Sequence, residues 1–159
     1  MRFTSRATLP LTPGAIAATL LDLDQWPRFT GYGPLPGIRS ASFLARTPGV
    51  VGSRIAVVNT DGSTHTEEIL EWDPERAIRL RLGGFSRPLR WFADHFDEAW
   101  AIEPHADGTT TVVRTFELHP RGWWGVPVLW VVRPLLRRAV MRSMAAFQTD
   151  PRNPGAGAA

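Results

Sequence analysis

The chain has 159 residues, a hydrophobic fraction of 43% and a formal net charge of +3, which is enough sequence for one domain with its own core. It contains no cysteine, so disulfides, thiolate nucleophiles and thiolate metal ligands are excluded. All 18 of its Lys and Arg positions are arginine, which excludes Schiff-base chemistry at a lysine.

The arginines are scattered except for a group between residues 133 and 142, so the charge does not indicate nucleic-acid binding. The longest apolar run is interrupted by Pro127 and ended by Arg133, and it falls short of the roughly 18 residues that a membrane span needs. The N-terminus reaches Pro10 without the apolar core of a signal peptide. We therefore expect a cytoplasmic protein.

The first elements follow from alternation and capping. Phe3–Leu9 reads as a strand with Phe3, Ser5, Ala7 and Leu9 on one face. Thr12 is a good N-cap and Pro13 a good first helical residue, which predicts a helix over Pro13–Leu23 that ends before Trp26 and Pro27. Residues 28–37 are rich in turn formers and aromatics, and they predict an ordered loop or a short second helix.

Six strands separated by turn signals are expected next. Their ranges are Ile38–Arg46, Gly52–Thr60, Ser63–Trp72, Ala77–Leu82, Phe92–Glu103 and Thr109–His119. Residues 85–91 predict a loop, with Phe85 and Trp91 at the rim of any cavity.

The segment Trp123–Gln148 predicts a long helix. It is amphipathic from Leu136 onward and apolar on all sides before Arg133, so another layer must cover it. Pro134 marks either a bend or the true start of this helix. Residues 149–159 offer nothing to pack and predict a disordered tail. The expected architecture is α+β, a single domain over residues 1–148, in which a curved antiparallel sheet of about seven strands wraps round the C-terminal helix, with two short helices after the first strand.

Short motifs occur in the same order as the elements. An acidic-then-Trp-Pro element spans residues 22–27, a Gly-x-Arg strand entry spans residues 52–54, an Asp-Pro turn lies at 73–74, and Gly-Thr-Thr lies at 108–110. Over residues 3–148 the chain resembles the helix-grip fold of the START/polyketide-cyclase superfamily (SRPBCC), in its polyketide cyclase/dehydrase-like branch.

That resemblance implies a deep, mostly apolar cavity between the sheet and the C-terminal helix. The leading hypothesis is a protein that binds a small hydrophobic ligand, such as a lipid or polyketide, without a cofactor. The alternative is a polyketide cyclase/dehydrase-like enzyme that acts on an apolar carbonyl substrate by acid-base catalysis. Fold alone does not choose between them.

The last hairpin carries the polar candidates. A turn centred near Ala106 and Asp107 places Glu98 opposite Arg114 on the apolar, inward face. These two residues form either a self-satisfied buried pair, or an anchor for a ligand carboxylate or carbonyl, or an acid–base centre at Glu98. Tyr32 could donate a hydrogen bond to a ligand carbonyl. The catalytic candidates are therefore Glu98, Arg114 and Tyr32.

The expected ligand-binding wall combines aromatic residues after the first helix, the inward face of the last hairpin and one side of the C-terminal helix. Its residues are Trp26, Phe29, Tyr32, Phe96, Glu98, Trp100, Arg114, Phe116, Leu129, Val132, Leu136, Val140 and Met144.

The four histidines are not expected to cluster. His95 and His119 fall on the outer face, His105 falls in a turn, and the face of His65 depends on a bulge, so no metal site is predicted.

The rim is expected to carry Trp123, Trp124 and Trp130. A third hypothesis is that these tryptophans bind a membrane surface or a partner protein. The expected state is a monomer or a homodimer.

Overall fold

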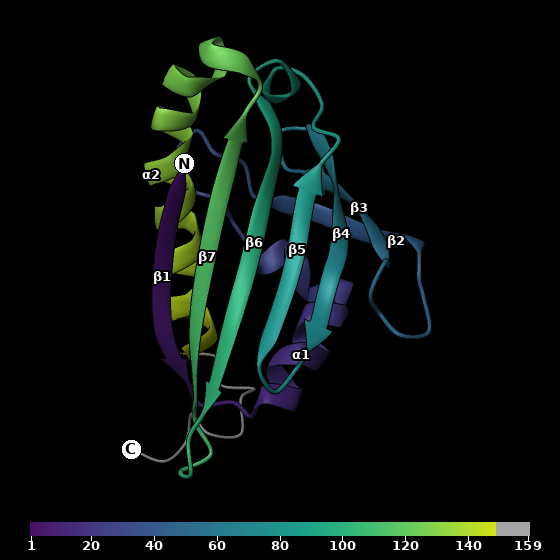
Figure 1. Ribbon diagram of the computed structural model, residues 1–159, viewed down its shortest axis with the longest axis vertical. Coiled ribbons are helices and arrows are strands. Elements are labelled where there is room, and N and C mark those ends of the chain that lie inside the picture. The colour runs from purple at the N-terminus through teal and green to yellow at the C-terminus, as the bar shows by residue number, and fades with distance from the viewer. Residues whose placement is uncertain (149–159) are drawn as a thin grey trace.

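The computed structural model describes residues 1–148 (Figure 1), and the predicted tail, residues 149–159, lies outside the described residues. The elements in chain order are β1 (Arg2–Leu9), α1 (Pro13–Leu21), the 3-10 helix η1 (Leu23–Arg28), β2 (Ile38–Ala45), β3 (Arg54–Asn59), β4 (Thr64–Asp73), β5 (Ala77–Gly83), the 3-10 turn η2 (Leu89–Trp91), β6 (Ala93–Pro104), β7 (Thr110–Pro120) and α2 (Gly122–Gln148).

The strands form one antiparallel sheet of seven strands in the order β1-β7-β6-β5-β4-β3-β2. The first and last strands of the chain are therefore neighbours, and β1 and β2 form the two edges of an open sheet. Alternating side chains give the sheet a buried and an exposed face. In β1, for example, Phe3, Ser5 and Leu9 are buried while the residues between them are mostly exposed. This is the expected α+β helix-grip fold, with a long C-terminal helix against a curved sheet.

Strand β2 lies at one edge of the sheet, and among the strands of residues 1–148 it pairs with β3 alone. Its pairing with β3 is irregular in two places, between Ile38 and Ser40 and between Phe43 and Ala45.

The helix α1 ends earlier than its sequence pattern predicts. Thr12 caps it as expected, its Oγ1 accepting a hydrogen bond from the Ala15 N–H at 3.3 Å. Asp22 leaves the helical conformation at φ −85° and ψ 87°, so the predicted end at Leu23 is two residues too late. The chain then continues as η1, which is tied to α1 by the Trp26 Nε1–H donating to the Leu20 carbonyl at 3.1 Å.

The helix α2 runs along the β1–β7 side of the sheet (Figure 1). It is continuous from Gly122 through Pro127 and Pro134, so the alternative in which it begins at Pro134 is wrong. Each proline removes one N–H and frees the carbonyl four residues earlier. Those carbonyls belong to Trp123 and Trp130, both exposed residues, where water can replace the missing donor.

The last hairpin has the predicted faces but a different register. Gly108 takes a φ of 83°, and the turn forms round Asp107, whose Oδ1 accepts from the Thr109 N–H and Oγ1–H. Glu98 therefore pairs with Phe116, and Trp100 pairs with Arg114. The expected direct pairing of Glu98 with Arg114 is wrong by two residues, and both side chains still face inward because side chains alternate with a period of two.

Within residues 1–148, no helix is both long enough and apolar enough to cross a membrane.

Candidate functional site

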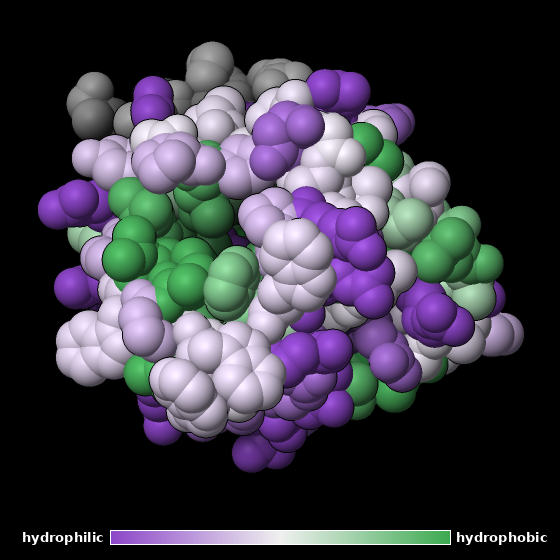
Figure 2. All heavy atoms as spheres, turned by 90° about the horizontal axis from the view of Figure 1, so that it is seen from above, coloured by the Kyte–Doolittle hydropathy of each residue, from purple (hydrophilic) through white to green (hydrophobic). Residues whose placement is uncertain are grey.

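A cavity of about 370 Å³ lies between the sheet, the η1–β2 segment and α2, which is within the size range of small-molecule sites. Figure 2 views the end of the molecule where α2 begins and shows a depression with hydrophobic residues inside. The β5–β6 loop at this end contributes residues 86–89 to the cavity lining.

Glu98 and Arg114 form a buried ion pair on the sheet wall of this cavity. The Arg114 Nε–H donates to Glu98 Oε1 at 2.7 Å, and the side chains are only 9% (Arg114) and 7% (Glu98) exposed. The two residues are diagonal neighbours on β7 and β6, and the long arginine side chain spans that separation. A guanidinium is therefore fixed in the wall of a mostly apolar cavity.

Two polar side chains flank Arg114 on the sheet. Arg114 lies between Ser5 of β1 and Trp100 of β6 in one row across the sheet, and its Cζ is 4.2 Å from the centroid of the Trp100 ring. The Trp100 indole N–H is buried beside the Glu98 carboxylate, and Trp100 and Arg114 both line the cavity. The Ser5 hydroxyl is buried without a hydrogen-bond partner within residues 1–148, but Ser5 is not part of the cavity lining. Arg114 and Trp100 are thus the donors in this row that a bound molecule can reach.

Burial in the cavity wall raises the pKa of Glu98, because a low-polarity surrounding disfavours the charged form. The neighbouring Arg114 charge and hydrogen bond oppose this rise in the pKa of Glu98, and the Glu67 carboxylate adds to it. Within the pair, the Glu98 carboxyl is therefore the group that can take up or release a proton.

A second polar pair, His65 and Glu67, lies on β4 and also faces the cavity. The His65 Nε2 is 3.2 Å from Glu67 Oε1, and both side chains are nearly buried. The expectation for His65 was open, and Glu67 was not among the predicted residues. Counting alternate positions back from the buried Ile69 on the same strand would have placed both of them on the inner face.

The structure brings a group of the residues expected to bind a ligand together around the cavity. The lining includes Trp26, Phe29, Phe96, Glu98, Trp100, Arg114, Phe116 and Leu136, together with Phe85 from the rim loop. Met144 instead lines a small adjoining pocket of about 20 Å³ that Trp100 and Arg114 share.

Four expected residues lie outside the lining. Leu129 and Val140 have no exposed surface, because α2 packs directly against β1 and β7 and leaves no space there. Val132 is partly buried against the same core. Tyr32 pairs with Leu35 across a tight turn and its ring lies under Arg138 on the surface, so it contributes no hydroxyl to the cavity.

The tryptophans at the start of α2 are exposed and do not line the cavity. Trp123 and Trp130 are 81% and 61% exposed. Trp124 is half exposed and donates its Nε1–H to the Trp91 carbonyl at 3.0 Å, which ties the start of α2 to the end of the β5–β6 loop.

The outer face of the sheet differs from expectation. His95 and His119 do come together, with ring centroids 4.2 Å apart. With Asp97 they form the one group of close potential metal ligands found within residues 1–148, and it lies across the sheet from the cavity.

The comparisons with known proteins agree with this geometry. The family model described as polyketide cyclase / dehydrase and lipid transport matches residues 1–150. The chain belongs to this family. No curated protein sequence matches it significantly.

Solved structures of this family's fold superpose over nearly the whole chain. The di-domain ARO/CYC BexL from the BE-7585A biosynthetic pathway has a TM-score of 0.67 at 17% identity, covering 93% of this chain and 45% of that one, so the present chain spans about half of BexL. Ara h 8.0201 has a TM-score of 0.68 at 18% identity, covering 94% and 99%. A START superfamily protein from Mycobacterium smegmatis has a TM-score of 0.61 at 12% identity, covering 91% and 97%.

Proposed function

We propose that this chain binds a small, mostly apolar molecule in the cavity and anchors one carbonyl or carboxylate oxygen of that molecule at Arg114. The observation that carries the proposal is that two buried donors, Arg114 and Trp100, lie side by side on the wall of a mostly apolar cavity. The family, which includes lipid transport proteins, supports a hydrophobic ligand.

The cavity lining favours an apolar ligand with a single oxygen atom positioned at Arg114. The aromatic and aliphatic lining supplies the apolar contacts that bury a ligand. A ligand oxygen at Arg114 makes charge-assisted hydrogen bonds in a site with little water, where such bonds are strong. A hydrocarbon of the same shape leaves those donors unpaired, which costs affinity.

Calorimetric titration of the full chain with 2-naphthoate, 2-acetonaphthone and naphthalene tests this anchor. We expect the acid and the ketone to bind more tightly than the hydrocarbon. The paired substitution Glu98→Leu with Arg114→Met removes both charges together, so neither is left buried alone. It should abolish the preference while naphthalene still binds.

Arg6→Met provides the control, because Arg6 pairs with Glu103 on the exposed face of the sheet. This variant should keep the full preference. Equal affinity of the unaltered chain for all three compounds would refute an oxygen anchor.

A second candidate function is acid–base catalysis on an apolar carbonyl compound, and the inward-facing His65–Glu67 pair favours it. In this reading Arg114 polarises the carbonyl and the imidazole, oriented by Glu67, takes a proton from the adjacent carbon. The similarity in fold to BexL, a di-domain ARO/CYC of a biosynthetic pathway, supports the same reaction class.

Loss of the methyl signal of 2-acetonaphthone in D₂O, followed by proton NMR, tests this step directly. The unaltered chain should exchange the methyl protons faster than buffer does, and His65→Gln should lose the acceleration without losing ligand affinity. An exchange rate equal to that of buffer would leave only the binding function.

A further inference from the structure

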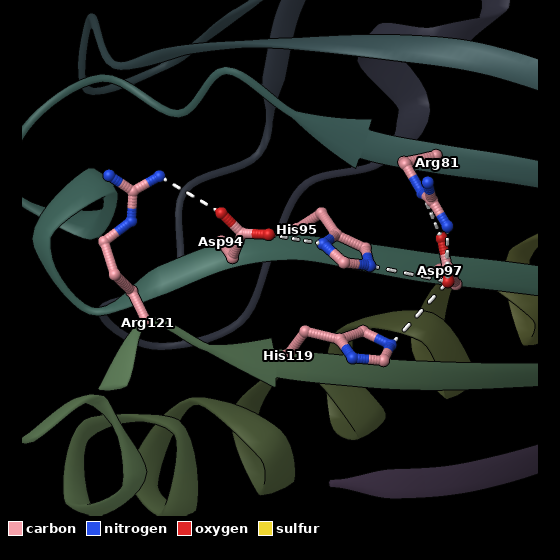
Figure 3. A network of polar contacts seen from close by, with 6 residues as sticks. All are labelled: Arg81, Asp94, His95, Asp97, His119 and Arg121. Atoms are coloured by element: carbon pink, nitrogen blue, oxygen red, sulfur yellow. Dashed lines mark hydrogen bonds and ion pairs between the residues drawn. The ribbon is translucent and has the colours of Figure 1, made fainter. Parts of the chain in front are cut away.

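The polar network on the outer face of the sheet is centred on β6 and β7, and Arg81 of β5 and Arg121, just after β7, complete it (Figure 3). Asp97 follows His95 at the next outward position on β6, and His95 pairs across the strands with His119 of β7. The inward residues between them belong to the cavity wall, so this cluster and the cavity share the same strands but occupy opposite faces.

The spacing of the cluster fits a bound metal ion better than a hydrogen-bond network. The Nε2 atoms of His95 and His119 each lie 3.6 Å from Asp97 Oδ2, which is too long for a hydrogen bond. Zn²⁺ binds imidazole nitrogen and carboxylate oxygen at about 2.0–2.2 Å in tetrahedral geometry, so two such ligands stand about 3.4 Å apart. The two observed distances from Nε2 to Oδ2 are close to this distance between ligand atoms.

The imidazoles are also prepared to coordinate. Asp94 Oδ2 lies 2.9 Å from His95 Nδ1, and a carboxylate only accepts, so Nδ1 carries a proton. The neutral form of this ring then has its lone pair on Nε2, the atom that faces Asp97. This carboxylate–histidine arrangement is the usual outer support of a metal-bound histidine. The Nε2 of His119 is buried and has no hydrogen-bond partner within residues 1–148.

Arginines fix the positions of the two carboxylates. Arg81 donates from Nε and Nη2 to the two oxygens of Asp97 at 2.7 and 3.1 Å. Arg121 lies 3.2 Å from Asp94. Asp97 is thereby fixed in place, and a second lone pair of Oδ2 remains for a cation.

We propose that His95, Asp97 and His119 form a binding site for a divalent transition-metal ion such as Zn²⁺, on the face of the sheet opposite the cavity. The ligand set of two imidazoles and one carboxylate suits Zn²⁺, Ni²⁺ or Cu²⁺ rather than Ca²⁺ or Mg²⁺. The imidazole rings of His95 and His119 are stacked within 13° of parallel. A rotation of each ring lets both Nε2 atoms coordinate one ion. The fourth position is open to water, and the ion joins β6 to β7.

Calorimetric titration of untagged full-length protein with ZnCl₂ at neutral pH tests the site. We expect one saturable site, and we expect His95→Ala and His119→Ala each to weaken it at least about tenfold, since even outer-sphere changes cost about 10–100-fold. His105→Ala is the matched control, because His105 lies at the end of the same hairpin and bonds Thr111 instead. It should leave the affinity unchanged.

Circular dichroism of each variant checks that the fold is retained, and His119→Gln replaces His119→Ala if the smaller side chain prevents folding. Titration with CoCl₂ gives an independent readout, since the visible absorption of a tetrahedral Co²⁺ site should appear with unaltered protein and disappear with His119→Gln. Absence of saturable Zn²⁺ binding, or binding that survives loss of His119, overturns the proposal. Neither outcome bears on the ligand cavity, because no organic ligand is used.

Discussion

At the scale of single residues, the Glu98–Arg114 pair dominates the energetics of the cavity. Both charges are removed from water, so their mutual attraction only offsets the cost of burying them. Losing one partner is therefore far worse than losing both, because the survivor is then a buried charge without compensation.

We predict that Arg114→Met lowers the free energy of unfolding by about 3–5 kcal/mol, and that adding Glu98→Leu restores most of this loss. Urea denaturation of the two variants measures the difference. Arg6→Met should change the free energy of unfolding by less than about 1 kcal/mol, because its pair with Glu103 is exposed and such pairs contribute little. A double variant no more stable than Arg114→Met would contradict the argument.

A second residue-scale prediction concerns the turn between β3 and β4 at the cavity margin. Hydrogen bonding from Ser63 lowers the pKa of Asp61, and Ser63→Ala should raise it, as measured by NMR titration of the carboxyl carbon. Asp107 is the control, since Thr109 makes the same two contacts to it and its pKa should not move.

The sign of the stability effect follows from linkage. The pKa of Asp61 is depressed in the folded chain, so its contribution is present above the pKa of the unfolded chain and is lost as the pH falls through the lower folded value. The stability difference between the unaltered chain and Ser63→Ala should therefore become smaller in strong acid, where only the hydrogen bond from Asn59 Nδ2–H to Ser63 Oγ still contributes. A difference that does not change with pH would contradict a role for the ionised carboxylate.

The sequence predicts which residues face inward more reliably than it predicts which residues touch. Glu98 and Arg114 face the cavity because strand side chains alternate, and that holds for any register that differs by two. Their diagonal contact depends on the centre of the turn at Asp107, which composition does not fix. Composition does not indicate the inward position of Glu67, because its strand is rich in polar residues, and that position follows only from its two-residue spacing from the buried Ile69.

At the scale of elements, α2 has two kinds of buried position. Leu129 is packed against the sheet, whereas Leu136 borders the cavity. Leu129→Ala should lower the free energy of unfolding by about 2–5 kcal/mol because it opens a new void in a packed region.

Leu136→Ala should cost clearly less than Leu129→Ala, because the space beside it already exists. Chemical denaturation of both variants gives the two losses in the free energy of unfolding. They can be compared directly because both are Leu-to-Ala substitutions on α2. Equal losses would mean that the cavity closes round Leu136 in solution.

The same helix shows what hydrophobic patterning leaves open. The apolar stripe correctly indicated that Leu129, Leu136 and Val140 are buried, but Leu129 and Val140 were also expected to border the cavity. Periodicity reports which side of a helix avoids water, and it does not report how closely the opposite layer approaches. That distance depends on the curvature of the sheet, which many small backbone choices determine together.

At the scale of the whole molecule, ligand binding and folding are linked. A ligand that binds only the folded chain at a hundred times its Kd adds about 2.7 kcal/mol to the free energy of unfolding. We predict this gain for 2-naphthoate, measured by urea denaturation with and without ligand.

Leu82→Trp fills part of the cavity from β5, where Leu82 belongs to the lining, and it should lose the gain while the chain stays folded. A gain in the free energy of unfolding that survives in this variant would place the ligand elsewhere.

The general architecture could be predicted from the sequence, because strand alternation and one long amphipathic helix leave few ways to cover the sheet.

The sheet is open, so its two edge strands could pair with other chains. One edge, β1, lies beside α2, but β2 at the other edge has no neighbouring strand within the described sheet. A straight edge strand is a template for strand addition and aggregation. The two irregularities near Ile38 and Phe43 twist this edge and shorten its regular part. An unclosed sheet can thus keep room for a cavity while remaining a poor template for fibril growth.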